Sequence, residues 1–207
     1  MPSKLAAKLP KGAAGGGIGS GTLLTMESSF VDVTIAAAES ARAAGRHAYA
    51  MEQLAYHDPL TGLWNRRAYD DRLHELFTRA DPRGVLLMVD VDGFKLVNDT
   101  YGHAAADRAL ILLAQAMLRG IRPGDFAARY GGDEFAILLP EAGLEEALAI
   151  GERLRADVER HVHDPDLTIS VGAAAVGATR RDTALAADQA LYDAKKSGRN
   201  RIMATGG

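Results

Sequence analysis

The segment ARYGGDEFAILLP, residues 128–140, sets two glycines and two acids between apolar runs that are typical of paired β-strands. The residues on either side predict a hairpin whose tip carries Gly131 and Gly132. The adjacent carboxylates, Asp133 and Glu134, either belong to a solvated turn or form part of a functional site that uses their charge. The sequence around the hairpin decides between these two interpretations.

Apolar periodicity on both sides of the hairpin predicts the other elements of the domain. These are helix 66–77, strand 84–91, helix 104–121, helix 144–158, strand 167–176 and helix 184–194, which Gly198 should end. From residue 84 onward the order is β-α-β-β-α-β-α. This order predicts an α+β fold of the ferredoxin-like type, with two helices on one face of a mainly antiparallel sheet.

The 207 residues divide into three predicted parts. Residues 1–25 form a flexible Gly/Ala-rich tail. Their GGGIGSG run fits neither the G-x-G-x-x-G nor the G-x-x-x-x-G-K-[ST] spacing of phosphate-binding loops. Residues 26–56 are Ala-rich, contain no proline and predict one helix, which is either a connector or a modest dimer-forming stalk. Residues 57–207 form the main domain. Removing residues 26–56 and measuring the rate per main domain at low protein concentration would test whether this helix controls the association of two domains.

Composition excludes several classes of protein. A net charge of −3 and a pI near 6.1 argue against a general nucleic-acid binder. The absence of cysteine excludes disulfides, thiol catalysis and thiolate metal sites. No apolar run approaches the roughly 20 residues that cross a bilayer, and the basic start lacks the apolar core of a signal peptide. We expect a cytoplasmic protein without membrane insertion.

Acidic residues also end the strand at 84–91. Side chains alternate along a strand, so Asp90 and Asp92 share one face. In the ferredoxin-like order this strand lies beside the hairpin, so Asp90 and the hairpin tip should meet at one end of the sheet. Clustered acids repel one another unless a proton or a cation neutralises them. Oxygen ligands favour Mg²⁺, with Mn²⁺ possible.

An EF-hand loop is the competing interpretation of DVDGFKLVNDTY, and it fails. Phe94 holds the fifth position, Lys95 stands at the sixth where glycine is required, and Tyr101 stands at the twelfth where glutamate is required.

Basic residues lie near the predicted acidic site. Gly93, Phe94 and Lys95 follow the strand in a glycine-containing turn whose N–H groups can converge on phosphate. Lys195 and Arg199 flank the glycine that ends the last helix, where they either stabilise the helix C-terminus or bind an anion. Acids for a metal ion together with bases for phosphate indicate nucleotide chemistry.

Five blocks in order resemble the diguanylate cyclase, or GGDEF, domain family: DPLTGLWNRRAY (58–69), DVDGFKLVNDTYGHAAAD (90–107), RYGGDEF (129–135), TISVGAA (168–174) and ADQALYDAKKSGRNR (187–201). The resemblance covers residues 57–203. It implies a fold similar to the nucleotide-cyclase and polymerase palm, and synthesis of cyclic di-GMP from two GTP with release of pyrophosphate.

The resemblance also implies residue roles. The Mg²⁺ ligands would be Asp90, the Val91 carbonyl and Asp133, with Asp133 and Glu134 beside the reacting phosphate as the catalytic acids. The substrate-binding residues would be Gly93, Phe94, Lys95, Asn98, His103, Asp107, Gly131, Gly132, Lys195 and Arg199. Among these, Asn98 and Asp107 would read guanine and the three basic residues would hold the triphosphate. His103 is either a substrate contact or a structural histidine.

The RPGD turn matches the R-x-x-D inhibitory product site of this family. Arg122 and Asp125 either stabilise their own turn or bind cyclic di-GMP. Ala106 departs from the glycine usual before the second guanine-reading acid. The symmetric product requires two domains face to face, so we expect a homodimer. The alternatives are a non-catalytic cyclic di-GMP receptor and another palm-fold nucleotidyl cyclase or polymerase.

Overall fold

The structure is a computed structural model that describes residues 37–47, 51, 55–162 and 167–205. Two compact units, residues 1–50 and 51–207, divide the chain. In the first unit, residues 37–47 are helical, within the predicted helix 26–56. The predicted tail lies outside the described residues. Among the helices that are described, none is both long and apolar enough to cross a membrane.

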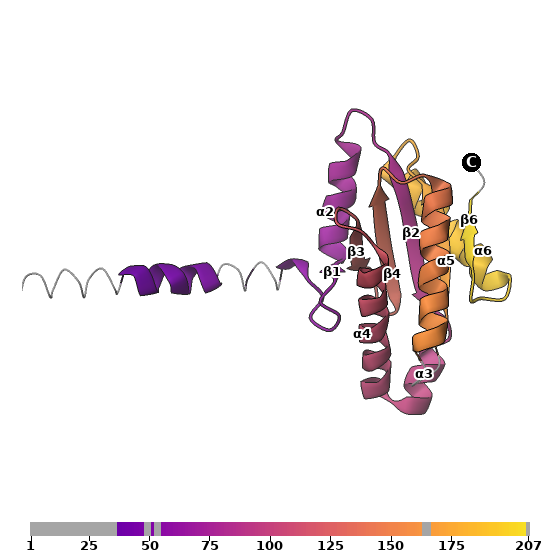
Figure 1. Cartoon of the computed structure of the whole chain (residues 1–207), viewed down its shortest axis with the longest axis horizontal. Helices are drawn as coiled ribbons and strands as arrows, with labels where there is room; N and C mark the ends of the chain where they lie inside the picture. Colours follow the sequence, from indigo (N-terminus) through magenta and orange to yellow (C-terminus); the bar gives the residue numbers. More distant parts are fainter. Residues whose placement is uncertain (1–36, 48–50, 52–54, 163–166, 206–207) are drawn as a thin grey trace, which may run out of the picture. The chain divides into compact units, whose positions relative to one another are not determined.

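The second unit is built on a six-stranded sheet of order β1-β3-β4-β2-β5-β6 (Figure 1). The four central strands pair antiparallel, and the two edge strands pair parallel with their neighbours. The strands are β1 (Trp64–Asn65), β2 (Gly84–Val91), β3 (Phe126–Arg129), β4 (Glu134–Pro140), β5 (Ile169–Ala175) and β6 (Ile202–Ala204). The predicted strands are confirmed, whereas β1 and β6 were not predicted.

Helices cover both faces of this sheet. They are α2 (Arg66–Phe77), α3 (Phe94–Tyr101), α4 (His103–Gly120), α5 (Leu144–His161) and α6 (Arg180–Lys196). Buried residues of α4 and α5 share one hydrophobic cluster with odd-numbered β2 residues, whereas those of α2 and α6 share the other with even-numbered ones. The succession β2-α4-β3-β4-α5-β5 is the predicted ferredoxin-like unit. The layer of α2 and α6 on the opposite face was not predicted.

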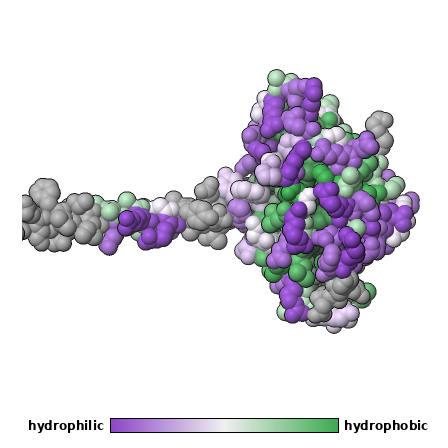
Figure 2. Space-filling model, viewed as in Figure 1, coloured by the Kyte–Doolittle hydropathy of each residue, from purple (hydrophilic) through white to green (hydrophobic). Residues whose placement is uncertain are grey.

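Strand β2 is buried along its whole length, which explains its nearly continuous apolar sequence. Its odd and even residues pack against different helix layers, so a register slip of one residue would exchange the two faces. Figure 2 shows hydrophilic side chains over much of the outer surface of this unit. The hydrophobic pattern therefore fixes where each residue at the end of β2 points.

Glycine breaks the region that follows β2 into two helices. Gly102 has φ 81° and separates α3 from α4. The predicted turn at residues 93–95 is accordingly the N-terminus of the short helix α3, with Gly93 at φ 67° as its N-cap. Figure 1 places α3 at the end of the sheet where β2 terminates.

Close packing of α6 on β5 depends on Gly172. A Cβ added there would lie 2.2 Å from the backbone nitrogen of Leu191 and 2.3 Å from the carbonyl oxygen of Ala187. Both contacts are with helix backbone, which cannot rotate away.

We therefore expect Gly172→Ala to lower the free energy of unfolding by about 1–3 kcal/mol or more, measured by urea denaturation. Gly120→Ala is the matched control, because nothing lies within 4 Å of a Cβ added there. Equal stability of the two variants would contradict this account of the α6–β5 contact.

Candidate functional site

The acids predicted to meet do so at one end of the sheet. Asp90 is the register partner of Glu134, and the backbone N–H of Val91 donates to the Asp133 carbonyl at 3.2 Å. Asp90 is only 7% exposed, because it lies in mid-sheet beside β4 and β5. Three carboxylates therefore lie close together where β2 ends and β4 begins.

The charge of Asp90 is balanced by α6. Burial raises the pKa of Asp90, and the negative charges of Asp133 and Glu134 raise it further. The Lys195 ammonium opposes this shift, with its Nζ 2.7 Å from the Asp90 Oδ2. The Asp90 carboxylate therefore needs a nearby cation to stay ionised.

The donor set fits a hard divalent cation in its chemistry, because carboxylate and carbonyl oxygens are the ligands that such ions prefer. Asp90, the Val91 carbonyl and Asp133 are the available oxygen donors. Within the described ranges, no three His, Cys, Asp or Glu side chains converge as a finished metal site. One Asp90 oxygen is instead bound by Lys195.

The hairpin tip is a tight turn that leaves space above one glycine. The backbone N–H groups of Tyr130 and Gly131 both donate to the Glu134 carbonyl, at 2.8 and 3.0 Å. A Cβ on Gly131 would lie 2.7 Å from Glu134 Oε2, whereas nothing lies within 4 Å of one on Gly132. Neither glycine has a positive φ, so backbone conformation requires neither of them, and at Gly131 a Cβ would displace only the end of the flexible Glu134 side chain.

A side chain that the sequence analysis missed holds the tip in place. The Arg129 guanidinium donates to both carboxylate oxygens of Asp58, at 3.1 and 3.2 Å, and to the Gly132 carbonyl at 2.8 Å. Burial disfavours the ionised Asp58, but hydrogen bonds from Thr61 and the Arg129 charge outweigh it and lower the pKa of Asp58. Asp58 and Arg129 stand 71 positions apart, so no local pattern reveals their contact.

The predicted base-reading side lies on α3 and α4. The Asn98 Oδ1 atom is buried and has no hydrogen-bond partner in the structure. Asp107 and His103 are exposed on α4, which packs beside α3. An unpaired buried acceptor is uncommon in proteins, because losing water without a new partner costs free energy. Asn98 is therefore a candidate ligand contact.

The predicted phosphate-binding residues lie around the same end of the sheet. The α3 N-terminus has no side-chain cap, and Lys95 is exposed in its first turn. Such an N-terminus can bind phosphate. At the end of α6, Gly198 and Arg199 donate to the carbonyls of Lys195 and Ala194 in a Schellman arrangement.

The predicted product-binding residues lie at the opposite end of the sheet. Asp125 precedes β3, and its carboxylate accepts from the Arg122 backbone N–H at 3.0 Å. The Arg122 side chain is 51% exposed and that of Asp125 only 2%. Both line a cleft of about 350 Å³ with two further arginines, Arg72 and Arg79. The structure thus separates this pair from the acidic site.

Known proteins resemble this chain in sequence. Residues 55–201 match the family model described as "Diguanylate cyclase, GGDEF domain". The chain is 38% identical over 174 residues to diguanylate cyclase DgcP of Pseudomonas aeruginosa, covering 79% of this chain and 26% of DgcP. It is 39% identical over 165 residues to the response regulator PleD of Caulobacter vibrioides, covering 73% and 36%. The chain thus spans about a quarter to a third of these relatives.

Solved structures show the same fold. The coiled coil and GGDEF domain of DgcB from Caulobacter crescentus, in complex with c-di-GMP, matches with a TM-score of 0.76 and 32% identity, covering 87% of this chain and 100% of that one. Diguanylate cyclase SiaD of Pseudomonas aeruginosa, in complex with its activator SiaC, matches with a TM-score of 0.70 and 36% identity, covering 89% and 77%.

The Lys195–Asp90 contact leads to a binding prediction. The ammonium and a divalent cation need the same carboxylate, so Lys195→Met should strengthen Mn²⁺ binding in the absence of nucleotide by about two- to fivefold, the range expected for a partly exposed pair. Titration calorimetry or Mn²⁺ spin resonance measures this affinity. Lys196→Met, at the neighbouring exposed lysine, is the control. Weaker Mn²⁺ binding by the Lys195 variant would contradict the competition.

Proposed function

The chain belongs to the diguanylate cyclase GGDEF-domain family, and from that premise we propose that it condenses two GTP into cyclic di-GMP and two pyrophosphates with the help of Mg²⁺ or Mn²⁺. The observation that carries the proposal is the meeting of Asp90 with Asp133 and Glu134 at one end of the sheet. A buried acid that needs a cation, beside two further acids and basic groups for phosphate, matches the demands of a nucleoside triphosphate.

In this proposal Asp90, the Val91 carbonyl and Asp133 hold the metal. A bound divalent cation would neutralise charge on the phosphates and polarise the attacking hydroxyl. Glu134 lies beside the same site and reaches the metal less directly or accepts the proton. Gly132 leaves open space above the tip, where the nucleotide approaches the backbone, and Gly131 lets the Glu134 side chain lie against the turn.

Base selection is assigned to Asn98 and Asp107. The unpaired Asn98 Oδ1 can accept from a guanine N–H, and the amide's NH₂ can donate to a guanine acceptor. The exposed Asp107 carboxylate can accept from the N1–H and N2–H₂ edge. His103 begins the same helix, α4, and contacts the substrate in this assignment.

The triphosphate would be held from two sides. The uncapped α3 N-terminus offers the N–H groups of Gly93, Phe94 and Lys95, together with the Lys95 ammonium. Lys195 and Arg199 add positive charge from the end of α6. Lys195 is bound to Asp90 in the structure, and its ammonium could turn to phosphate oxygens when a triphosphate and its cation occupy the site, since a bound cation would neutralise Asp90.

Two domains must cooperate in the reaction. The 3′-hydroxyl of each GTP attacks the α-phosphorus of the other, so each domain supplies half of a two-fold site. Pyrophosphate leaves from each α-phosphorus as the new ester bond forms. We propose that the protein acts as a homodimer and that residues 26–56 promote the encounter.

Incubation with GTP and Mg²⁺, followed by chromatography of the products, tests the proposal. We expect cyclic di-GMP, and Asp90→Ala should lower its rate of formation by at least about a hundredfold, because it removes a metal ligand. Asp70→Ala, at an exposed acid on α2, is the control and should be near the parent. Tight binding of cyclic di-GMP without turnover in the parent would instead support the receptor alternative.

We also propose feedback inhibition by cyclic di-GMP at Arg122 and Asp125. The half-exposed Arg122 guanidinium and the neighbouring Arg72 and Arg79 supply positive charge for the two phosphates of the product. Asp125 would accept from a guanine edge after releasing the Arg122 N–H. The distance of this cleft from the acidic end makes the inhibition allosteric.

Arg122→Ala should therefore raise the inhibition constant for cyclic di-GMP by about tenfold or more, the loss expected for charge-assisted hydrogen bonds. Its initial rate should match the parent, whereas its progress curve should stay linear for longer. Arg181→Ala, at an exposed arginine at the start of α6, controls for the lost charge. If Arg122→Ala bound product and slowed as the parent does, the assignment would be wrong.

A further inference from the structure

The loop that carries Arg199 has an unusual backbone. Gly198, Arg199 and Asn200 have φ values of 115°, 61° and 45°. The Schellman end of α6 requires a left-handed residue only at Gly198. Arg199 is strained in this region, whereas asparagine enters it more readily, and strain at a residue such as Arg199 persists only where the surroundings hold it. Something outside the loop must therefore fix it.

Three hydrogen bonds join Asn200 to two distant parts of the chain, the residue after β2 and helix α5. Its backbone N–H donates to Asp92 Oδ2 at 3.0 Å. Its side-chain oxygen accepts from Arg155 NH1 at 2.7 Å, and its Nδ2 donates to Glu159 Oε1 at 2.7 Å. Arg155 and Glu159 lie on α5, which packs on the sheet face opposite to α6.

The partners of Asn200 are themselves fixed. Asp92, two residues beyond Asp90, also accepts from the hydroxyls of Thr168 and Ser170, at 2.8 and 2.7 Å. Arg155 donates to Glu152 at 2.8 Å and to Glu159 at 2.7 Å. Its side chain is only 14% exposed, so α5 holds it between these acids. Arg155 and Asn200 both donate to Glu159 and lower the pKa of its carboxyl, which keeps it ionised.

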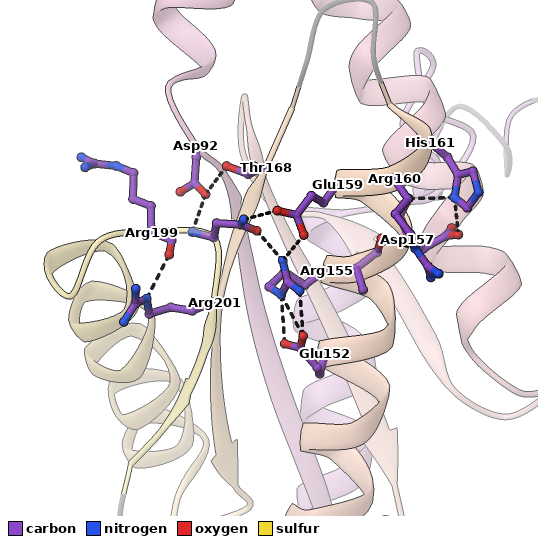
Figure 3. Close-up of polar contacts among 12 residues, drawn as sticks. Asp92, Glu152, Arg155, Asp157, Glu159, Arg160, His161, Thr168, Arg199 and Arg201 are labelled. Carbon is purple, nitrogen blue, oxygen red and sulfur yellow. Dashed lines mark hydrogen bonds and ion pairs between the residues drawn. The ribbon is translucent and has the colours of Figure 1, made fainter.

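The position of Arg199 follows from these contacts. In Figure 3 its side chain extends away from the Glu152–Arg155–Glu159 cluster, while its carbonyl oxygen accepts from Arg201 Nε at 2.9 Å. The network therefore holds the backbone of the loop and leaves the Arg199 guanidinium available. A different conformation at Asn200 would redirect that guanidinium.

We infer that Asn200, held by Arg155 and Glu159 of α5 and by Asp92, is a positioning residue that aims Arg199 at the β- and γ-phosphates of the substrate. The inference rests on the proposed function, because the triphosphate clamp includes Arg199. Asn200 does not touch the substrate in this assignment, and its effect on binding passes through Arg199 alone.

Binding of GTP and GMP to the 207-residue chain, measured by calorimetry, tests the inference. We expect Asn200→Ala and Arg155→Met each to weaken GTP binding by about tenfold, and to leave GMP binding at the parent value because GMP lacks the two outer phosphates. Arg160→Met is the matched control: Arg160 lies on the same helix and, among the residues that the structure describes, donates only to the Ala156 carbonyl of that helix. It should bind both nucleotides as the parent does.

A double-mutant cycle separates positioning from general damage. On an Arg199→Ala background, Asn200→Ala should cause no further loss of GTP affinity, because the group through which it acts is gone. The same loss in both backgrounds, or a parent-like GTP-to-GMP preference in the folded variants, would overturn the inference. Arg155→Met leaves the loop sequence intact, so it decides the matter if Asn200→Ala fails to fold.

These outcomes are independent of the cyclisation assay. A parent protein that binds GTP but forms no cyclic dinucleotide would contradict the proposed function. The affinity ratios would still decide whether Asn200 positions Arg199.

Discussion

The pairing of β2 with β4 is the constraint on which the candidate site depends. It places Asp90 opposite Glu134 and the Val91 N–H against the Asp133 carbonyl. Both strands are almost entirely buried, and each of their faces contributes to a different hydrophobic cluster. A shift of one residue would turn the apolar side chains of β2 to the wrong layers and carry Asp90 to the other face. Hydrophobic packing along the strands thus specifies the acidic cluster at their end.

That cluster is unfavourable by itself, and the second helix layer makes it tolerable. Burial and two neighbouring acids raise the pKa of Asp90, so the ionised form needs a positive partner. Helix α6 reaches Asp90 with Lys195, and α6 can approach closely because β5 carries Gly172 beneath it. The ion pair between Lys195 and Asp90 therefore depends on the absence of a side chain at Gly172 in the core. Helix α6 lies outside the ferredoxin-like unit, and its Lys195 supplies the positive charge that the acids of that unit lack.

The sequence reveals much of this architecture because its signals are local. Apolar runs predicted the four central strands, and helical spacing predicted the major helices. The meeting of Asp90 with the hairpin tip followed from element order. The edge strands β1 and β6, with two and three residues, are too short for any periodicity. Helix α3 was missed because the glycines around it indicate turns.

The side-chain contacts that join loops to distant elements could not be predicted, because neither a local pattern nor the order of elements carries them. Arg129 is hydrogen-bonded to Asp58, 71 positions away in the sequence, and Asn200 to Asp92, 108 positions away. Each residue alone has an ordinary local interpretation as a turn acid, a strand arginine or a residue after a helix. One sequence without relatives contains no record of which of these residues pair. The fold brings them together, so the fold has to be known first.

The contacts of Arg129 and Asn200 each fix a loop of the candidate site. The hairpin tip and the loop after α6 are the parts of the candidate site that lie outside the helices and strands. Arg129 ties the tip to the segment preceding β1, and Asn200 ties the loop to α5 and to the end of β2. The left-handed conformation of Arg199 costs roughly 1–2 kcal/mol, and the three hydrogen bonds of the neighbouring Asn200 offset that strain. The site is therefore positioned by both helix layers, although its acids come from the sheet alone.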